Sequence, residues 1–136
     1  MTSASQPSKG LHIALWIVQV LLAAMFTMSG TMKLTTPIEV LGAQMDWVKE
    51  MPFLIHFIGV SEIAGSLGLL LPSILRIKPV LTAWAAIGLL TIMVLAAALH
   101  LSRGEWGSVA GNFVFGAMAS FVAWGRMKKA VIAPRA

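Results

Sequence analysis

The chain has 136 residues, of which 58% are hydrophobic and 11% are charged. So few charged residues cannot cover the surface of a soluble domain of this size, so the composition indicates one integral membrane domain. The net charge of +5 does not indicate a nucleic-acid binder, because the cations lie at the ends of apolar segments and not in one patch. The absence of cysteine excludes disulfides, thiolate nucleophiles and iron–sulfur clusters.

The chain begins with a polar stretch over residues 1–10, which predicts a disordered tail. The apolar run that follows, over about 11–33, is long enough to cross a bilayer and too long for the core of a signal peptide. It ends without a convincing cleavage site. We therefore interpret this run as a retained first span.

The loop after the first span contains a helix-start pattern. Thr36, Pro37 and Glu39 have the spacing of a capping box with proline at the first helical position. Apolar residues then follow at helical spacing: Ile38, Leu41, Met45 and Val48. The pattern predicts a short amphipathic helix on the outer face that ends at Pro52. An irregular loop is the alternative.

Three further apolar runs of spanning length follow, over about 53–71, 79–101 and 109–125. Pro72 closes the second span and Pro79 opens the third, so Arg76 and Lys78 between them predict a tight turn. None of the runs alternates with period two as barrel strands do. The predicted fold class is therefore all-α: a four-helix integral membrane bundle in one domain over 11–126, with a basic tail over 127–136.

The cations predict the orientation of the bundle. With a cytoplasmic N-terminus, seven of the ten Lys and Arg residues lie inside: Lys9, Arg76, Lys78, Arg126, Lys128, Lys129 and Arg135. The outside then holds three cations and four of the five acids. This asymmetry follows the positive-inside rule and predicts that both termini are cytoplasmic. The tryptophans, with Trp47 and Trp106 in the outer loops, are typical of an aromatic belt.

Polar residues within spans are the candidates for function, because they are costly in lipid and usually face the protein interior. Glu62 is the one acid inside a predicted span, and Ser66 shares its helical face with small residues that would let a neighbouring helix approach. Ser29 and Lys33 share a stripe in the first span, while His100 and Asn112 lie on stripes of small residues in the third and fourth.

These stripes predict a thin polar interior biased to the outer half of the bundle, with a pocket that opens outward or sideways into the outer leaflet. They would also suit a homodimer contact. Structural interpretations stay open for each residue. In these interpretations Glu62 would be protonated and would only form structural hydrogen bonds. His100 would be a side chain at the membrane interface, and Asn112 would cap the start of its helix. For Lys33 we favour snorkelling to the outer headgroups over a bond to Glu62, which lies more than one helical turn deeper. No residue pattern predicts a metal site.

Two segments resemble the signatures of the DoxX-like family. The first is Met25–Leu34 followed by Pro37, with a small residue before Lys-Leu at the end of the first span. The second is the Gly-x-x-Glu-x-x-Gly core over 59–65. The end of the third span at His100 and the Asn112-bearing fourth span also fit, so the resemblance covers nearly the whole chain.

The resemblance implies a small four-span protein of the bacterial cytoplasmic membrane, with Lys33 and Glu62 at the family's polar positions. The family is named for its similarity to a subunit of a thiosulfate:quinone oxidoreductase, and some members are thought to assemble with redox enzymes. Other relatives act as membrane chaperones or assembly factors. The lack of cysteine argues against intrinsic sulfur chemistry in this chain.

Two classes of function follow. In the first, the chain is a redox-associated subunit that binds a quinone or another small lipophilic molecule, Glu62 relays a proton, and a membrane-associated oxidoreductase partner supplies the electrons. The ligand-binding residues would be Lys33, Ser29, Ser66, His100 and Asn112. In the second, it is a non-enzymatic chaperone, assembly or scaffold protein. The sequence holds no self-contained catalytic motif and implies no intrinsic cofactor, and four unbroken spans make transport a weaker interpretation.

Overall fold

The computed structural model describes residues 6–136, so residues 1–5 of the predicted N-terminal tail lie outside the described part. The described chain is helical and has no strand. Its long helices are α1 (Lys9–Thr35), α4 (Pro52–Leu75), α5 (Val80–Ser102) and α6 (Trp106–Trp124). All four are long and apolar enough to cross a membrane. The predicted all-α membrane bundle is confirmed.

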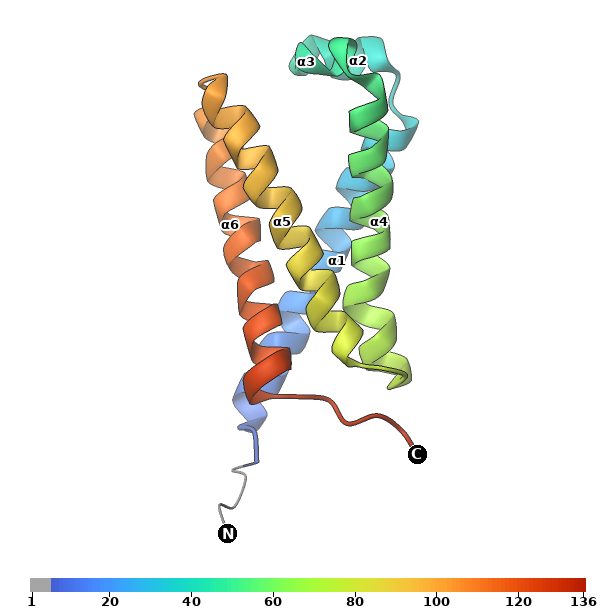
Figure 1. Ribbon diagram of the computed structural model, residues 1–136, viewed down its shortest axis with the longest axis vertical. Helices are drawn as coiled ribbons and strands as arrows, with labels where there is room; N and C mark the ends of the chain where they lie inside the picture. The colour runs from blue at the N-terminus through green and yellow to red at the C-terminus, as the bar shows by residue number, and fades with distance from the viewer. Residues whose placement is uncertain (1–5) are drawn as a thin grey trace.

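The four long helices cross as well as pack side by side (Figure 1). We call the end of the bundle at which α1 begins and α6 ends the terminal end, and the opposite end the α2–α3 end. Helices α4 and α5 meet at the terminal end and diverge toward the α2–α3 end, whereas α1 and α4 converge at the α2–α3 end and diverge toward the terminal end. The two helix pairs α4–α5 and α1–α4 therefore form two wedges that open in opposite directions.

A core of apolar side chains fills the middle of the bundle. Leu22 and Phe26 of α1, Leu69 of α4, Leu89 of α5 and Val122 of α6 are all buried there. The outward faces carry large apolar side chains that are exposed, such as Phe53 at 81% and Phe113 at 72%. Such exposure over a whole surface suits contact with lipid and not with water.

The loop after α1 contains two short helices, α2 (Ile38–Gln44) and α3 (Trp47–Glu50), where the sequence predicted one. The chain is extended at Met45, between them, and this break turns Trp47 and Val48 inward. Both side chains are buried and pack with Leu41 and Ile55, against which Leu99 of α5 also packs. The prediction that Trp47 belongs to an aromatic belt is therefore wrong, whereas Trp106 is 68% exposed.

The predicted capping box does not form. The backbone N–H of Thr36 bonds to the carbonyl of Met32 and ends α1, so Pro37 becomes the N-cap of α2 and no side chain caps that helix. A residue that terminates one helix through its backbone is not positioned to cap the next one with its side chain.

Helix α4 continues past Pro72 to Leu75, one turn beyond the predicted end. A proline so close to the end of a helix removes only one hydrogen bond, and membrane helices tolerate it. The helix ends instead at Arg76, which adopts a left-handed conformation with φ 55°, and Lys78 follows with φ 45°. The tight turn predicted at these two residues is confirmed.

After α6 the chain forms a π-helical turn, η1 (Gly125–Lys129), and continues in an extended conformation. This C-terminal segment crosses the terminal end beneath α4 (Figure 1). The Arg76 guanidinium donates to the carbonyl oxygens of Ala133 at 2.9 Å and Pro134 at 3.4 Å, and the Arg135 N–H donates to the Arg76 carbonyl at 3.0 Å. Part of the predicted basic tail over 127–136 is thus held against the bundle.

Candidate functional site

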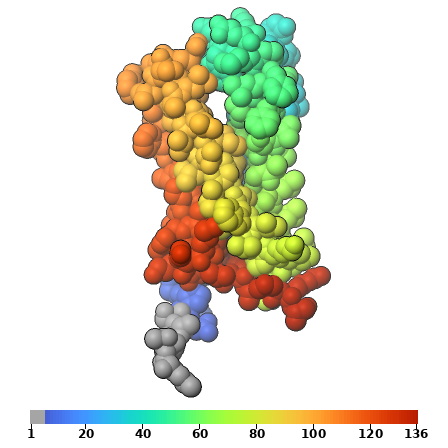
Figure 2. Space-filling view, in the orientation of Figure 1, coloured from blue at the N-terminus to red at the C-terminus, as the bar shows by residue number. Residues whose placement is uncertain are grey.

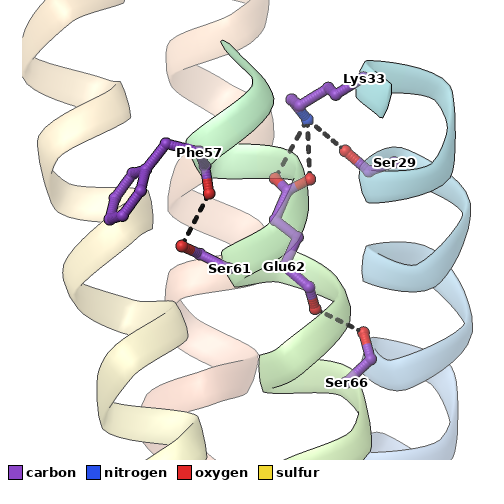
Figure 3. Close-up of polar contacts among 6 residues, drawn as sticks. All are labelled: Ser29, Lys33, Phe57, Ser61, Glu62 and Ser66. Atoms are coloured by element: carbon purple, nitrogen blue, oxygen red, sulfur yellow. Dashed lines mark hydrogen bonds and ion pairs between the residues drawn. The ribbon is translucent and has the colours of Figure 1, made fainter. Parts of the chain in front are cut away.

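Lys33 of α1 and Glu62 of α4 form an ion pair inside the bundle (Figure 3). The Lys33 ammonium donates to both carboxylate oxygens of Glu62, at 3.0 and 3.1 Å, and also to the hydroxyl of Ser29. The Glu62 side chain is 3% exposed and that of Lys33 is 21% exposed. The expectation that Lys33 snorkels to the headgroups is therefore wrong.

The ion pair forms because α1 and α4 approach closely and their side chains lean toward each other. A Cβ added to Gly30 would lie 2.7 Å from the Gly59 carbonyl oxygen, so only glycine lets the two backbones come this near. Helical side chains tilt toward the N-terminus of their own helix. The helices run in opposite directions, so Lys33 leans toward the terminal end and Glu62 toward the α2–α3 end, and the long lysine stem bridges the difference in depth.

Two cavities adjoin the ion pair, and Lys33, Glu62, Met93 and Asn112 line both of them. The smaller, about 290 Å³, is the methionine cavity, which is also lined by Met25, Met28, Met32, Ser29, Phe26 and Phe115. Sequence analysis did not find this grouping, because three of its methionines lie on α1 and the fourth comes from α5. Thioethers are soft, polarisable groups that make favourable contacts with aromatic rings.

The larger cavity, about 380 Å³, lies in the wedge between α4 and α5 at the α2–α3 end, and we call it the lateral cavity. Trp47, Phe57, Leu95, Leu99 and His100 are among its lining residues. Phe57 and Leu95 are 58% and 66% exposed, which places the mouth of the cavity at the lipid-facing surface. Figure 2 shows an opening between the helices in this region.

Two residues that line the lateral cavity carry hydrogen-bond donors without a partner in the described chain. These donors are the indole Nε1 of Trp47 and the amide Nδ2 of Asn112, and both atoms are buried. An unsatisfied buried donor costs about 1–3 kcal/mol. Lys33 lines the same cavity, so three residues that carry hydrogen-bond donors share its lining with one carboxylate, that of Glu62.

The structure brings most of the predicted site residues together. Lys33, Glu62 and Asn112 line both cavities, Ser29 lines the methionine cavity and His100 lines the lateral cavity. The His100 ring is hydrogen-bonded to Glu105 at the turn between α5 and α6. Asn112 lies in the second turn of α6, where no backbone N–H needs a cap.

Ser66 lies apart from this group. Its hydroxyl donates to the backbone carbonyl of Glu62 at 2.8 Å, and it lines a different groove, between α1 and α4. Ser61 makes the equivalent bond to Phe57 at 2.8 Å (Figure 3). Bonds of this kind satisfy a hydroxyl within its own helix.

Sequence analysis missed a second polar cluster, at the terminal end. Arg126, counted there only as an inside cation, is 4% exposed. Its guanidinium donates to Gln19 Oε1 at 2.5 Å and to the Ala130 carbonyl at 3.0 Å, and lies 3.0 Å from His12 Nδ1 and 5.3 Å from the Trp16 ring centre. The sequence holds part of the evidence for this cluster, because Gln19 is a polar amide in the middle of an apolar span.

At the rim of the lateral cavity, Glu105 also accepts from Arg103 Nε at 3.2 Å. The hydrogen bond with His100, assisted by that with Arg103, holds the pKa of the Glu105 carboxyl below its ordinary value. Across residues 6–136, no three His, Asp or Glu side chains gather in a way that could hold a metal ion. The site therefore offers donors, one carboxylate and apolar surface, which suit an uncharged or weakly polar organic molecule.

Comparison with known proteins is consistent with this architecture. No curated protein and no solved structure matches the chain. A family model described as the DoxX-like family matches residues 17–122, which includes all four long helices in whole or in large part and every residue of the ion pair and its two cavities. The protein is a multi-pass membrane protein that belongs to the DoxX-like family.

Proposed function

We propose that this DoxX-like protein binds a small lipophilic molecule with a hydrogen-bond-accepting oxygen, a quinone being the best fit, beside the Lys33–Glu62 pair. The observation that carries the proposal is the lateral cavity, which is lined by Lys33, Trp47 and Asn112, the last two with N–H donors that have no partner within residues 6–136. A carbonyl oxygen in the lateral cavity would give these donors the acceptor that the protein itself does not supply. An apolar cavity with a few polar groups is typical of small-molecule sites.

Within this proposal the residues have separate roles. Asn112 and Lys33 would donate hydrogen bonds to the carbonyl oxygens, and Glu62 would pass protons to the ligand through Lys33. Reduction of a quinone to a quinol takes up two electrons and two protons. The chain has no cysteine and no group of metal ligands in its described part, so the electrons would come from an oxidoreductase partner in the membrane.

The mouth of the lateral cavity suits a ligand that arrives from the bilayer. Phe57 and Leu95 flank it and face the lipid, so a quinone tail would remain among acyl chains while the ring entered between α4 and α5. We further propose that the protein lies in the bacterial cytoplasmic membrane with its terminal end inside. The α2–α3 end and its cavity would then open toward the outer leaflet.

A non-enzymatic role as a chaperone or scaffold is the second candidate. The observation that favours it is the completeness of the ion pair, since both Glu62 oxygens already accept from Lys33. A carboxylate that is fully paired within the protein is consistent with a structural role. The two candidates differ in whether the cavities are occupied by a ligand.

The test is binding of decylubiquinone, a short-chain quinone, to the protein in mild detergent, followed by quenching of tryptophan fluorescence. We expect saturable quenching in the wild type, because Trp47 lines the cavity. The variant Asn112→Leu should weaken binding by about tenfold, the effect of removing one hydrogen bond of about 1.4 kcal/mol. Mass spectrometry of the purified protein would show whether a quinone is retained from the membrane.

Two controls make this test specific. Trp106→Phe removes an exposed tryptophan outside the cavity and should leave the saturable phase unchanged, whereas Trp47→Phe should abolish most of it. The variant Glu62→Gln removes the carboxylate of the ion pair, and its control is Glu39→Gln, which removes a carboxylate from the exposed loop. If neither wild type nor Glu62→Gln binds the quinone and both are equally stable, the binding function is wrong.

A further inference from the structure

A long furrow runs along α1 and α4 in the wedge that opens toward the terminal end. Its two parts share Ile74: a groove of about 820 Å³ at the terminal end, which we call the wide end, and a smaller one of about 630 Å³ that continues toward the middle of the bundle. On α1 the lining residues recur every three or four positions, so they form one continuous stripe: Lys9, Ile13, Trp16, Val20, Ala24, Thr27 and Thr31. The inner part of the furrow shares Met28 and Met32 with the methionine cavity, whereas its wide end lies at the terminal end, away from the ion pair.

The wide end of the furrow is cationic. Lys9 and Arg76 line it and are exposed, and Ser73 and His12 also line the same groove. The buried Arg126 guanidinium stands directly behind its wall, in contact with His12 and Trp16, and its Nη2 has no partner in the described chain. No Asp or Glu side chain balances these charges here, because all five acids of the chain lie at Glu39, Asp46, Glu50, Glu62 and Glu105.

The rest of the furrow is largely apolar and elongated, because its lining on α1 runs from Val20 to Met32. Small side chains of α1, such as Ala23, Ala24 and Thr27, form its floor, and Leu67 and Leu71 of α4 form its side. Leu67 and Leu71 are 54% and 46% exposed, so the furrow is open to the bilayer along its length. An extended hydrocarbon chain fits this shape better than a globular ligand does.

We propose that the furrow binds one anionic phospholipid, with its phosphate between Lys9 and Arg76 and one acyl chain along the α1–α4 seam. The proposal combines three features in one place: unbalanced positive charge, an apolar channel that leads away from it, and a C-terminal segment that forms a wall. Val131 and Ala133 line the groove, and the bonds from Arg76 to Ala133 and Pro134 hold this segment in position. The bound lipid would join α1, α4 and the C-terminal segment where the helices diverge.

The chemistry distinguishes an anionic lipid from other occupants. A zwitterionic headgroup carries its own ammonium, which the groove cations would repel, so phosphatidylglycerol should bind better than phosphatidylcholine. Free phosphate would gain the charge interaction but would leave the apolar furrow unfilled, so it should compete weakly.

The experiment is native mass spectrometry of the full chain in mild detergent with phosphatidylglycerol or phosphatidylcholine at equal concentration. We expect one phosphatidylglycerol adduct in clear preference to phosphatidylcholine. Lys9→Gln should reduce the affinity about fivefold, the effect of about 1 kcal/mol for one cation at a headgroup. Its control, Lys128→Gln, removes an exposed cation outside the groove and should change little.

A second variant tests the acyl-chain half of the furrow. Ala24→Trp fills the channel and leaves every charge in place, so it should also reduce the adduct, whereas Ala117→Trp on the lipid-facing surface of α6 should not. Equal binding of the two lipids, equal losses in Lys9→Gln and Lys128→Gln, or full displacement by inorganic phosphate would each overturn the proposal. Thermal unfolding of each variant would show that it is folded before its binding is compared.

Discussion

The Lys33–Glu62 pair is the residue-scale feature on which the candidate site depends. Removing one member of a buried ion pair leaves the other charge without a partner, and this usually costs more than the pair contributes. We therefore expect Lys33→Met to lower the free energy of unfolding by about 3 kcal/mol, because the 3%-exposed Glu62 side chain would keep only weak partners. Unfolding in detergent with a chemical denaturant would measure this change.

The double variant Lys33→Met/Glu62→Gln is the control for that interpretation. It removes both charges, so it should recover a large part of the stability lost in Lys33→Met. If the effects of the two single variants simply add, the side chains are not coupled and the ion pair does not stabilise the bundle. Lys128→Met, at an exposed position, should have no measurable effect.

The sequence predicted which residues belong to the site better than it predicted their contacts. Lys33, Glu62 and Asn112 could be identified because polar groups in an apolar span are conspicuous. The bond between Lys33 and Glu62 could not, because residue positions give the depth of each backbone atom, whereas the side chains of antiparallel helices tilt toward each other's depth. Trp47 and Arg126 were assigned to the surface because their burial depends on a loop break and a π-helical turn that leave no periodic pattern.

At the scale of elements, the crossing of α1 and α4 depends on two glycines. A Cβ added to Gly59 would lie 3.0 Å from the Gly30 carbonyl oxygen and 3.1 Å from the Lys33 Cβ. We expect Gly59→Ala to force the helices apart and to destabilise the protein by about 1–3 kcal/mol, the usual cost of overpacking. Thermal unfolding in detergent would report this loss.

Gly88→Ala is the matched control, since it also lies inside a long helix but an added Cβ there would have no neighbour within 4 Å. Alanine favours helix over glycine, so this variant should be neutral or slightly stabilising. Equal destabilisation by the two substitutions would contradict a specific role for the Gly30–Gly59 crossing.

The turn between α5 and α6 provides a prediction about pH. The pKa of Glu105 is lowered by its hydrogen bonds with His100 and Arg103, so the folded protein holds this proton less tightly than the unfolded chain does. The stabilisation is therefore present above the ordinary carboxyl pKa of 4.5 and is lost as the pH falls through the lower value of the folded state. Glu105→Gln should be less stable than the wild type at neutral pH, and the difference should shrink below pH 4.5.

Melting temperatures of both proteins across this pH range would check the prediction. Glu50→Gln, in the loop at the same end of the bundle, controls for the general effect of removing an acid. A difference between wild type and Glu105→Gln that stayed constant down to strongly acidic pH would show that ionisation of Glu105 does not stabilise the turn.

The element boundaries show which local signals are reliable in a membrane chain. The length of the apolar segments identified the four long helices, because a backbone in lipid has no water to satisfy its hydrogen bonds and must satisfy them internally. Local capping and proline signals were less reliable, since α4 runs through Pro72 and the loop helix divides at Met45. Both departures have causes outside the local sequence. The membrane environment favours continuation of α4 through Pro72, and burial of Trp47 and Val48 favours the break at Met45.

At the scale of the whole molecule, the two oppositely directed wedges separate two kinds of site. The lateral cavity occupies the wedge between α4 and α5 at the α2–α3 end, and the proposed lipid furrow occupies the wedge between α1 and α4 at the terminal end. Arg126 and Gln19 join η1 to α1 near the terminal end, and the hydroxyls of Ser73 and Thr82 join α4 to α5 at 2.7 Å. The Ser73–Thr82 bond holds α4 and α5 together at the terminal end, so their diverging ends at the α2–α3 end are the part of this helix pair best placed to admit a ligand.

The orientation of the bundle decides which side of the membrane each wedge faces. Seven cations lie at or beyond the terminal end, whereas four of the five acids lie at the α2–α3 end, and this asymmetry favours a cytoplasmic terminal end. Because the chain has no cysteine, single introduced cysteines can report the orientation without background. We expect a membrane-impermeant maleimide to label Ser102→Cys in intact bacterial cells and to label Lys128→Cys only after lysis. Labelling of Lys128→Cys alone in intact cells would reverse the orientation and place the lipid furrow in the outer leaflet, where the quinone mouth is proposed to lie.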